Sequence, residues 1–149
     1  MKSIKDEVYW VIKDQILGVR KPSNQEEVKT LMKLGVGGII TLLDDTENHD
    51  LYEEVGIDFL WLPVKGGSVQ NLKQVEDAHA FALKIWENSK SLAVHCSGGK
   101  KRTATLIASI LIKNNNSFEE TLNIISKANP DIKLNEGQLE FIDQLAKEF

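Results

Sequence analysis

The 149-residue chain has little of several features that define special classes of protein. It has one cysteine, Cys96, which excludes an intrachain disulfide and a disulfide-framed secreted fold. Its net charge of −4 argues against a non-specific nucleic-acid binder. Its longest apolar stretch, Ala104 to Ile112, is too short to span a bilayer, and residues 1–16 lack the apolar segment of a signal peptide. We therefore expect a cytoplasmic monomer without a membrane span or a nucleic-acid partner.

Arginine is also scarce, since Arg20 and Arg102 are the only two among 18 basic residues. Arginine offers a planar fork that grips two oxygens at once, which lysine cannot do, so rare arginines point to specific uses. The sequence suggests no partner for Arg20. Otherwise the composition, with 42% hydrophobic and 27% charged residues, is that of an ordinary globular protein, and residues 1–149 are predicted to form one domain.

Short apolar runs alternate with helical patterns along the chain. Strands are predicted at residues 8–12, 15–19, 38–43, 57–64 and 92–95. Helices are predicted from 23 to 34, 51 to 55, 71 to 88, 102 to 113, 117 to 128 and 135 to the end, with Ser23–Glu26 and Ser117–Glu120 as capping boxes. This alternation predicts an α/β fold with a mostly parallel twisted sheet and helices on both faces. Ligands of such sheets bind beyond the carboxyl ends of the strands.

The loop between the predicted strand 92–95 and the helix from Arg102 lies at such an end. A helix N-terminus presents free N–H groups and a partial positive charge. Two glycines, Gly98 and Gly99, allow the loop to turn further N–H groups inward. The result is a cradle for a phosphate group. The residues that would line it are Ser97, Gly98, Gly99, Lys100, Lys101 and Arg102.

Three side chains give this cradle a chemistry beyond binding. Cys96 would lie at its floor, where the same dipoles lower the thiol pKa and favour the nucleophilic thiolate. Arg102 can fold back and grip two oxygens of the bound group. Thr103 can place its hydroxyl on the sulfur. Taken singly, a lone cysteine is usually a small buried apolar residue and a Gly-Gly-Lys-Lys segment is usually a turn. Together, at this spacing, they favour a site.

A nucleotide-binding P-loop does not fit this segment. That motif needs Ser or Thr directly after Gly-Lys and a second glycine five residues before the first. Here Lys101 follows Lys100, and Val94 stands at the glycine position.

The residues His95, Cys96, Gly99, Arg102 and Thr103 match the pattern His-Cys-x-x-Gly-x-x-Arg-Ser/Thr. By this motif the chain resembles a compact dual-specificity phosphatase of the cysteine-dependent protein tyrosine phosphatase superfamily. The resemblance implies a phosphocysteine intermediate on Cys96 and no metal or other cofactor. It implies phosphomonoester substrates, namely phosphotyrosine and also phosphoserine or phosphothreonine on proteins. His95 would support the loop from beneath and help to keep Cys96 ionised.

The chain departs from this family at the expected general acid. The family takes that proton from an aspartate in the loop after the strand that here ends near Val64, and the matching position is Gly66. Loss of such an acid costs roughly 10²–10⁴-fold in rate. Asp44 and Asp45 are the candidate replacements, because they follow another strand at the same edge, and Asp44 is preferred. Both could equally be loop-capping carboxylates.

Two alternatives to a protein phosphatase remain open. Gly66 favours a catalytically weak or inactive phosphate-binding pseudophosphatase. Lys65, Lys100 and Lys101 could form a positive rim, which would suit a phosphoinositide or another multiply charged phosphomonoester, although solvated lysines are common.

Overall fold

The computed structural model describes residues 2–148, which form a sheet of five strands in the order β1-β2-β5-β3-β4. The strands are β1 (Tyr9–Ile12), β2 (Ile16–Val19), β3 (Val36–Thr41), β4 (Asp58–Trp61) and β5 (Ser91–His95). Strand β1 pairs antiparallel with β2, and all other pairs are parallel. The predicted fold class, a mostly parallel sheet with helices on both faces, is confirmed.

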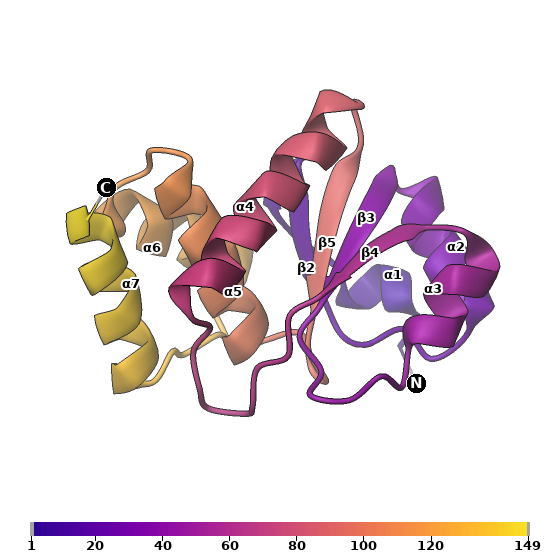
Figure 1. Ribbon diagram of the computed structural model, residues 1–149, viewed down its shortest axis with the longest axis horizontal. Helices are drawn as coiled ribbons and strands as arrows, with labels where there is room; N and C mark the ends of the chain where they lie inside the picture. The colour runs from indigo at the N-terminus through magenta and orange to yellow at the C-terminus, as the bar shows by residue number, and fades with distance from the viewer. Residues whose placement is uncertain (1, 149) are drawn as a thin grey trace.

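In the described part of the chain, seven helices cover the two faces of the sheet. They are α1 (Ile4–Glu7), α2 (Gln25–Lys33), α3 (His49–Val55), α4 (Leu72–Glu87), α5 (Lys101–Lys113), α6 (Phe118–Ala128) and α7 (Glu136–Glu148). Figure 1 shows α1, α2 and α3 on one side of the sheet and α4 to α7 on the other. Within residues 2–148, no helix is long and apolar enough to cross a membrane.

Alternation along the strands divides the core between the two faces, because successive strand residues point to opposite sides. Ile40 and Val94 pack in the cluster beneath α4 to α7, whereas Ile39 and Ala93 pack in the cluster beneath α1 to α3. Helix α5 is buried at every residue from 103 to 112. The loop of residues 96–100 is therefore fixed at one end by the buried strand β5 and at the other by the buried helix α5.

The predicted start of α2 is wrong by one residue. The N-cap of α2 is Asn24, whose side chain accepts a hydrogen bond from the Glu27 N–H, and it is not Ser23. The Ser23 N–H donates to Glu27 and not to Glu26 (2.8 Å). The reason is that Glu27 pairs with Arg20, a contact that the sequence did not reveal. The capping box at Ser117 and Glu120 is confirmed.

The carboxyl ends of the central strands lie level with one another. His95 at the end of β5 is in register with Val19 of β2 on one side and with Thr41 of β3 on the other. In Figure 1 the loops that follow β3, β4 and β5 accordingly meet along the lower edge of the molecule. Beyond β4 the chain stays extended beside β3, since the Val64 N–H donates to the Leu42 carbonyl (3.1 Å).

Candidate active site

The loop of residues 96–100 joins β5 to α5 at this edge, and its shape depends on one glycine. Gly99 has φ +74°, in the left-handed region that favours glycine. A Cβ atom at Gly99 would also overlap the backbone of Val19 and Arg20, at the end of β2. At Gly98 a Cβ atom would meet only open space. Gly99 is therefore required both by its backbone angle and by close packing, whereas Gly98 is required by neither.

Cys96 lies at the base of this loop with only 4% of its surface exposed. Thr103, in the first turn of α5, donates a hydrogen bond from its hydroxyl to the Cys96 sulfur at 3.2 Å. Burial acts to raise the pKa of the Cys96 thiol. Hydrogen bonds from the Thr103 hydroxyl and from the N–H groups of Thr103 and Gly99, with the charge of Arg102, outweigh burial and lower that pKa below its ordinary value. The lowered pKa makes the Cys96 thiolate more populated than that of an unperturbed cysteine.

His95 supports the loop through a buried chain of hydrogen bonds. Its Nδ1 lies 3.1 Å from the Cys96 carbonyl and must carry the proton, because a carbonyl can only accept. Its Nε2 then accepts from the Tyr52 hydroxyl at 2.5 Å, and that hydroxyl accepts from the Asn48 amide at 3.0 Å. Burial lowers the pKa of His95 to about 4, so the ring is neutral at pH 7. His95 therefore acts on the loop through the Cys96 carbonyl and brings no positive charge to the sulfur.

Arg102 reaches the loop that follows β4. Its Nη1 donates to the Val64 carbonyl at 2.8 Å, which joins the start of α5 to residues 62–70. Gly66, at the position where the family carries its acid, is exposed, and a side chain there would meet nothing. The site thus has its guanidinium anchored beside Cys96 and no carboxylate in the loop after β4.

The two candidate proton donors after β3, Asp44 and Asp45, differ in their contacts. Asp45 accepts a hydrogen bond from the Glu47 N–H (2.9 Å) and so caps its own turn. Asp44 is exposed. Trp61 holds the preceding residue, because its indole N–H donates to the Leu43 carbonyl at 2.7 Å. Asp45 therefore has a structural role. Asp44 follows Leu43, which Trp61 anchors, and lies after β3, the neighbour of β5 in the sheet.

The lysines expected at the rim, Lys65, Lys100 and Lys101, are all exposed, as are Ser97 and Gly98. They belong to the loop after β4 and to the segment that opens α5, which Arg102 and Val64 join. These lysines are thus exposed at the end of the loop, at the start of α5 and in the loop after β4.

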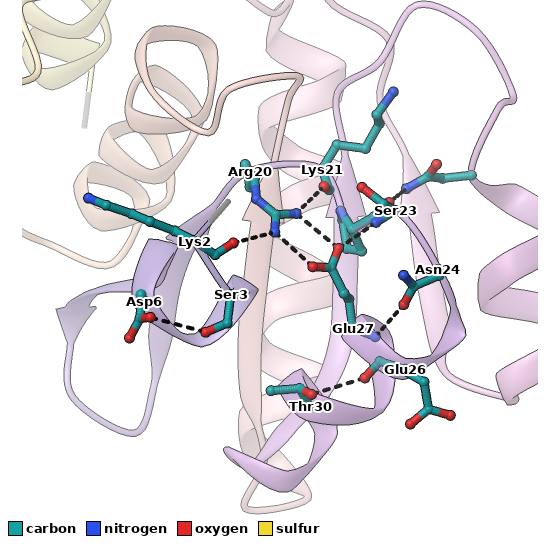
Figure 2. Close-up of polar contacts among 12 residues, drawn as sticks. Lys2, Ser3, Asp6, Arg20, Lys21, Ser23, Asn24, Glu26, Glu27 and Thr30 are labelled. Atoms are coloured by element: carbon teal, nitrogen blue, oxygen red, sulfur yellow. Dashed lines mark hydrogen bonds and ion pairs between the residues drawn. The ribbon is translucent and has the colours of Figure 1, made fainter.

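Arg20, for which the sequence suggested no partner, has a supporting role. Its guanidinium donates to both Glu27 oxygens, at 2.9 and 2.7 Å, and to the Lys21 carbonyl (Figure 2). This pair ties the segment after β2 to α2. The Lys21 N–H in that segment donates to the Ser97 carbonyl at 3.1 Å, so Arg20 braces the phosphate-loop candidate from outside.

Sequence reasoning missed the residues that hold the loop from other elements. Tyr9 of β1 donates from its hydroxyl to the Gly99 carbonyl at 2.6 Å. Tyr52 contacts His95, and Asn48 donates to Tyr52. Tyr9 lies 90 positions from Gly99 and Tyr52 lies 43 positions from His95, while Asn48 is the N-cap of the helix that contains Tyr52. No local spacing links them to the Cys96 segment, so only the pairing of the strands could have revealed them.

Comparison with known proteins agrees with this geometry. The family model described as "PTP-SAK: Swiss Army Knife protein, DSP-PTPase phosphatase domain" matches residues 5–143. Phosphatidylglycerophosphatase and protein-tyrosine phosphatase 1 of Rattus norvegicus is 32% identical over 121 residues, which are 76% of this chain and 63% of that protein. Phosphatidylglycerophosphate phosphatase PTPMT2 of Arabidopsis thaliana is 25% identical over 148 residues, which are 93% of this chain and 63% of that protein. The chain thus spans less than two thirds of each relative.

Solved structures show the same architecture. The crystal structure of PTPMT1 in complex with PI(5)P superposes with a TM-score of 0.84 at 25% identity, covering 96% of both chains.

Proposed function

This chain belongs to the DSP-PTPase phosphatase domain family, and from that premise we propose that it is a cysteine-dependent phosphatase of phosphorylated lipid head groups. The observation that carries the proposal is the pairing of Cys96 with Thr103 at 3.2 Å, which lowers the thiol pKa beside an anchored Arg102. A buried thiol with no chemical role has no need of a hydroxyl donor and a guanidinium. The pairing therefore favours a nucleophile.

In the proposed reaction the Cys96 thiolate attacks phosphorus. A sulfur–phosphorus bond forms while the bond from phosphorus to the leaving oxygen breaks. Arg102 and the inward N–H groups of the loop stabilise the charge on the transferring group, which is the main contribution to such transfers. Water then attacks the phosphorus of the phosphocysteine and gives one proton to the carboxylate that acted as the acid in the first step. The sulfur–phosphorus bond breaks, inorganic phosphate leaves, and the thiolate returns to the hydrogen bond from Thr103.

Asp44 is the proposed proton donor to the leaving oxygen in the first step. Its position after β3 supports this role, because β3 lies directly beside the strand that precedes Cys96. Asp45 is excluded from the proposal by its turn-capping hydrogen bond to Glu47. Replacing Asp44 by Asn is expected to lower kcat about 10²–10⁴-fold with a poor leaving group and to remove the alkaline fall in rate. Asp45→Asn is the matched control and should keep that fall.

Two observations favour a lipid head group over a protein substrate. Lys65, Lys100 and Lys101 are exposed around the loop of a chain whose net charge is −4, so positive charge is gathered where an anionic surface would approach. The relatives in rat and Arabidopsis are both named for phosphatidylglycerophosphate phosphatase activity, which the rat name gives beside protein-tyrosine phosphatase, and the superposable PTPMT1 was crystallised with PI(5)P.

A second candidate function, a phosphate-binding module without turnover, is favoured by Gly66. A cradle with a nucleophile and no acid in the loop after β4 could bind phosphate and turn it over too slowly to matter.

The first test is phosphate release from para-nitrophenyl phosphate between pH 4 and 8, for the wild type and for Cys96→Ser. Turnover that disappears in Cys96→Ser is the expected result. If the wild type released no phosphate from this substrate, which has a good leaving group, the enzyme proposal would be rejected and the phosphate-binding module would remain.

The substrate class needs a separate comparison. Phosphate release would be measured from vesicles containing phosphatidylglycerophosphate, from vesicles containing PI(5)P and from a phosphotyrosine peptide. We expect kcat/KM for one of the lipids to exceed that for the peptide at least about 10-fold, equivalent to about 1.4 kcal/mol. A peptide that is hydrolysed faster than both lipids would reject the lipid proposal and leave the cysteine chemistry standing.

A further inference from the structure

Tyr9 makes a contact with the phosphate-loop candidate that the reaction above does not use. It lies on the edge strand β1, and its hydroxyl donates to the Gly99 carbonyl at 2.6 Å. The two residues are 90 positions apart in the sequence. Burial, and then the charge of Cys96, raise the pKa of Tyr9, so the hydroxyl keeps its proton and remains a donor.

The tyrosine ring is guided to this place by Gly18. Residues Tyr9 and Gly18 are paired across β1 and β2, and a Cβ atom at Gly18 would overlap the end of the Tyr9 ring, including its hydroxyl. Only glycine at position 18 therefore lets the ring lie across β2 toward the loop. The pairing of β1 with β2 therefore fixes the position of the Tyr9 hydroxyl.

The contact determines which way one peptide group of the loop faces. A trans peptide is planar, so the C=O of Gly99 and the N–H of Lys100 point in opposite directions. Holding the Gly99 carbonyl outward turns the Lys100 N–H to the inner side of the loop. The Cys96 and Ser97 carbonyls are likewise held from outside, by the His95 ring and by the Lys21 N–H.

Tyr9 differs from the other two supports in the kind of group that makes the contact and in its distance along the chain. His95 is the neighbour of Cys96, and Lys21 acts through its backbone, which any residue provides. Tyr9 acts through a side-chain hydroxyl from a distant strand. Gly99 is buried and has positive φ, so without that hydroxyl its carbonyl has lost an outside donor and its peptide is freer to rotate.

We propose that Tyr9 is a positioning residue for oxyanion binding, which acts through the Gly99–Lys100 peptide and orients the Lys100 N–H toward the transferring phosphoryl group. The inference deepens the proposed function and rests on it for the meaning of the site. The binding step, however, can be tested without turnover.

The test variant is Tyr9→Phe, which removes the hydroxyl and keeps the ring over Gly18. The matched control is Ser91→Ala, because the Ser91 hydroxyl also donates to a distant backbone carbonyl, that of Asp14, at 2.8 Å, at the opposite end of β5. Binding of inorganic phosphate and of tungstate would be measured by calorimetry, with thermal unfolding recorded for each protein. We expect Tyr9→Phe to weaken binding of both anions about 5- to 30-fold, the effect of losing one hydrogen bond.

Ser91→Ala should lower the unfolding temperature and leave anion affinity within about twofold of the wild type. If Tyr9→Phe kept wild-type affinity, or if Ser91→Ala lost as much affinity as Tyr9→Phe, Tyr9 would have only a structural role and the proposal would be overturned.

A spectroscopic signal separates positioning from general destabilisation. In the wild type, the backbone amide proton of Lys100 should move downfield when phosphate is added, because it donates to the anion. This shift should be much smaller in Tyr9→Phe at saturating phosphate. An unmoved Lys100 amide in the wild type would overturn the proposal even if Tyr9→Phe did not fold. If the wild type bound phosphate but showed no turnover, only the proposed enzymatic function would be rejected, and the role of Tyr9 in binding would remain.

Discussion

Cys96 shows how a buried thiol can have a lowered pKa. Burial alone would keep the proton on sulfur, yet the pKa of Cys96 is lowered because donors and a positive charge surround it. The strongest of these donors is the Thr103 hydroxyl, one turn into α5. The lowered pKa of Cys96 therefore depends on a few named groups around its sulfur.

Replacing Thr103 by Val should make Cys96 less reactive at low pH. The variant keeps the shape of the side chain and removes the hydrogen bond that stabilises the thiolate, so the pKa of Cys96 rises. The rate of alkylation by iodoacetamide at pH 6 is expected to fall on the order of 10-fold. Thr105→Val is the control, because the Thr105 hydroxyl donates to the Lys101 carbonyl at 2.7 Å and not to sulfur. Equal rates in the wild type and Thr103→Val would contradict the assignment.

His95 should make the protein less stable as the pH falls from about 6.5 toward 4. Its pKa is lowered to about 4 in the folded protein, while an unfolded histidine titrates near 6.5, so the unfolded chain binds the proton more tightly in this window. Urea unfolding at pH 7 and pH 5 measures the effect. The loss between these pH values should be smaller in His95→Gln by about 2 kcal/mol. His79→Gln, a histidine bonded to Asn114 far from the site, should retain the wild-type loss.

At the scale of elements, the site is a loop held by groups that lie in or directly after four strands. Outside donors from β1, from the segment after β2 and from His95 of β5 hold its carbonyls, and the Leu42 N–H, directly after β3, donates to the His95 carbonyl at 2.9 Å. A loop whose carbonyls are bound outward has its N–H groups facing inward before any anion arrives. Such preorganisation is what makes electrostatic stabilisation effective.

The two loop glycines should respond differently to alanine. In Gly99→Ala, the positive φ and the overlap with the end of β2 should lower the free energy of unfolding by about 2 kcal/mol or more. In Gly98→Ala, where the new methyl group meets open space, the change should stay within about 0.5 kcal/mol. Urea denaturation of the two variants checks this, and equal losses would show that β2 does not constrain the loop.

At the scale of the whole molecule, charge is distributed unevenly. The chain carries a net charge of −4, yet Lys65, Lys100 and Lys101 are exposed around the candidate active site. Local potential, and not net charge, steers a charged substrate to a site, and salt screens it. An acidic protein can therefore attract an anionic surface at one edge.

Replacing Lys65, Lys100 and Lys101 together by Gln should raise KM for lipid vesicles about 10-fold at low salt. The difference from the wild type should shrink at high ionic strength, because exposed charges are screened. The matched control replaces Lys29, Lys73 and Lys147, which pair with carboxylates elsewhere, and changes the net charge equally. If both triple variants behaved alike, net charge alone would explain the effect.

The types and order of the main helices and strands followed from the sequence, but the residues at which they begin and end often did not. The strand predicted over 57–64 ends at Trp61, because its continuation runs beside β3 without full ladder pairing. The four-residue helix α1 was not predicted, since so short a segment has no periodicity to detect. The α2 cap moved by one residue because a tertiary ion pair, Arg20 with Glu27, overrode the local capping pattern.

The sequence by itself determined the strand, loop and helix around Cys96 and the spacing of Cys96, Arg102 and Thr103. The reason is that residues within two turns of one another meet through local backbone geometry. Only the tertiary structure decided which distant groups hold that loop: the Tyr9 hydroxyl, the Tyr52–His95 pair and the Val64 carbonyl on Arg102. Those contacts depend on the strand order β1-β2-β5-β3-β4. Hydrophobic alternation specifies which face of a strand is buried, but it does not specify which strand lies beside it.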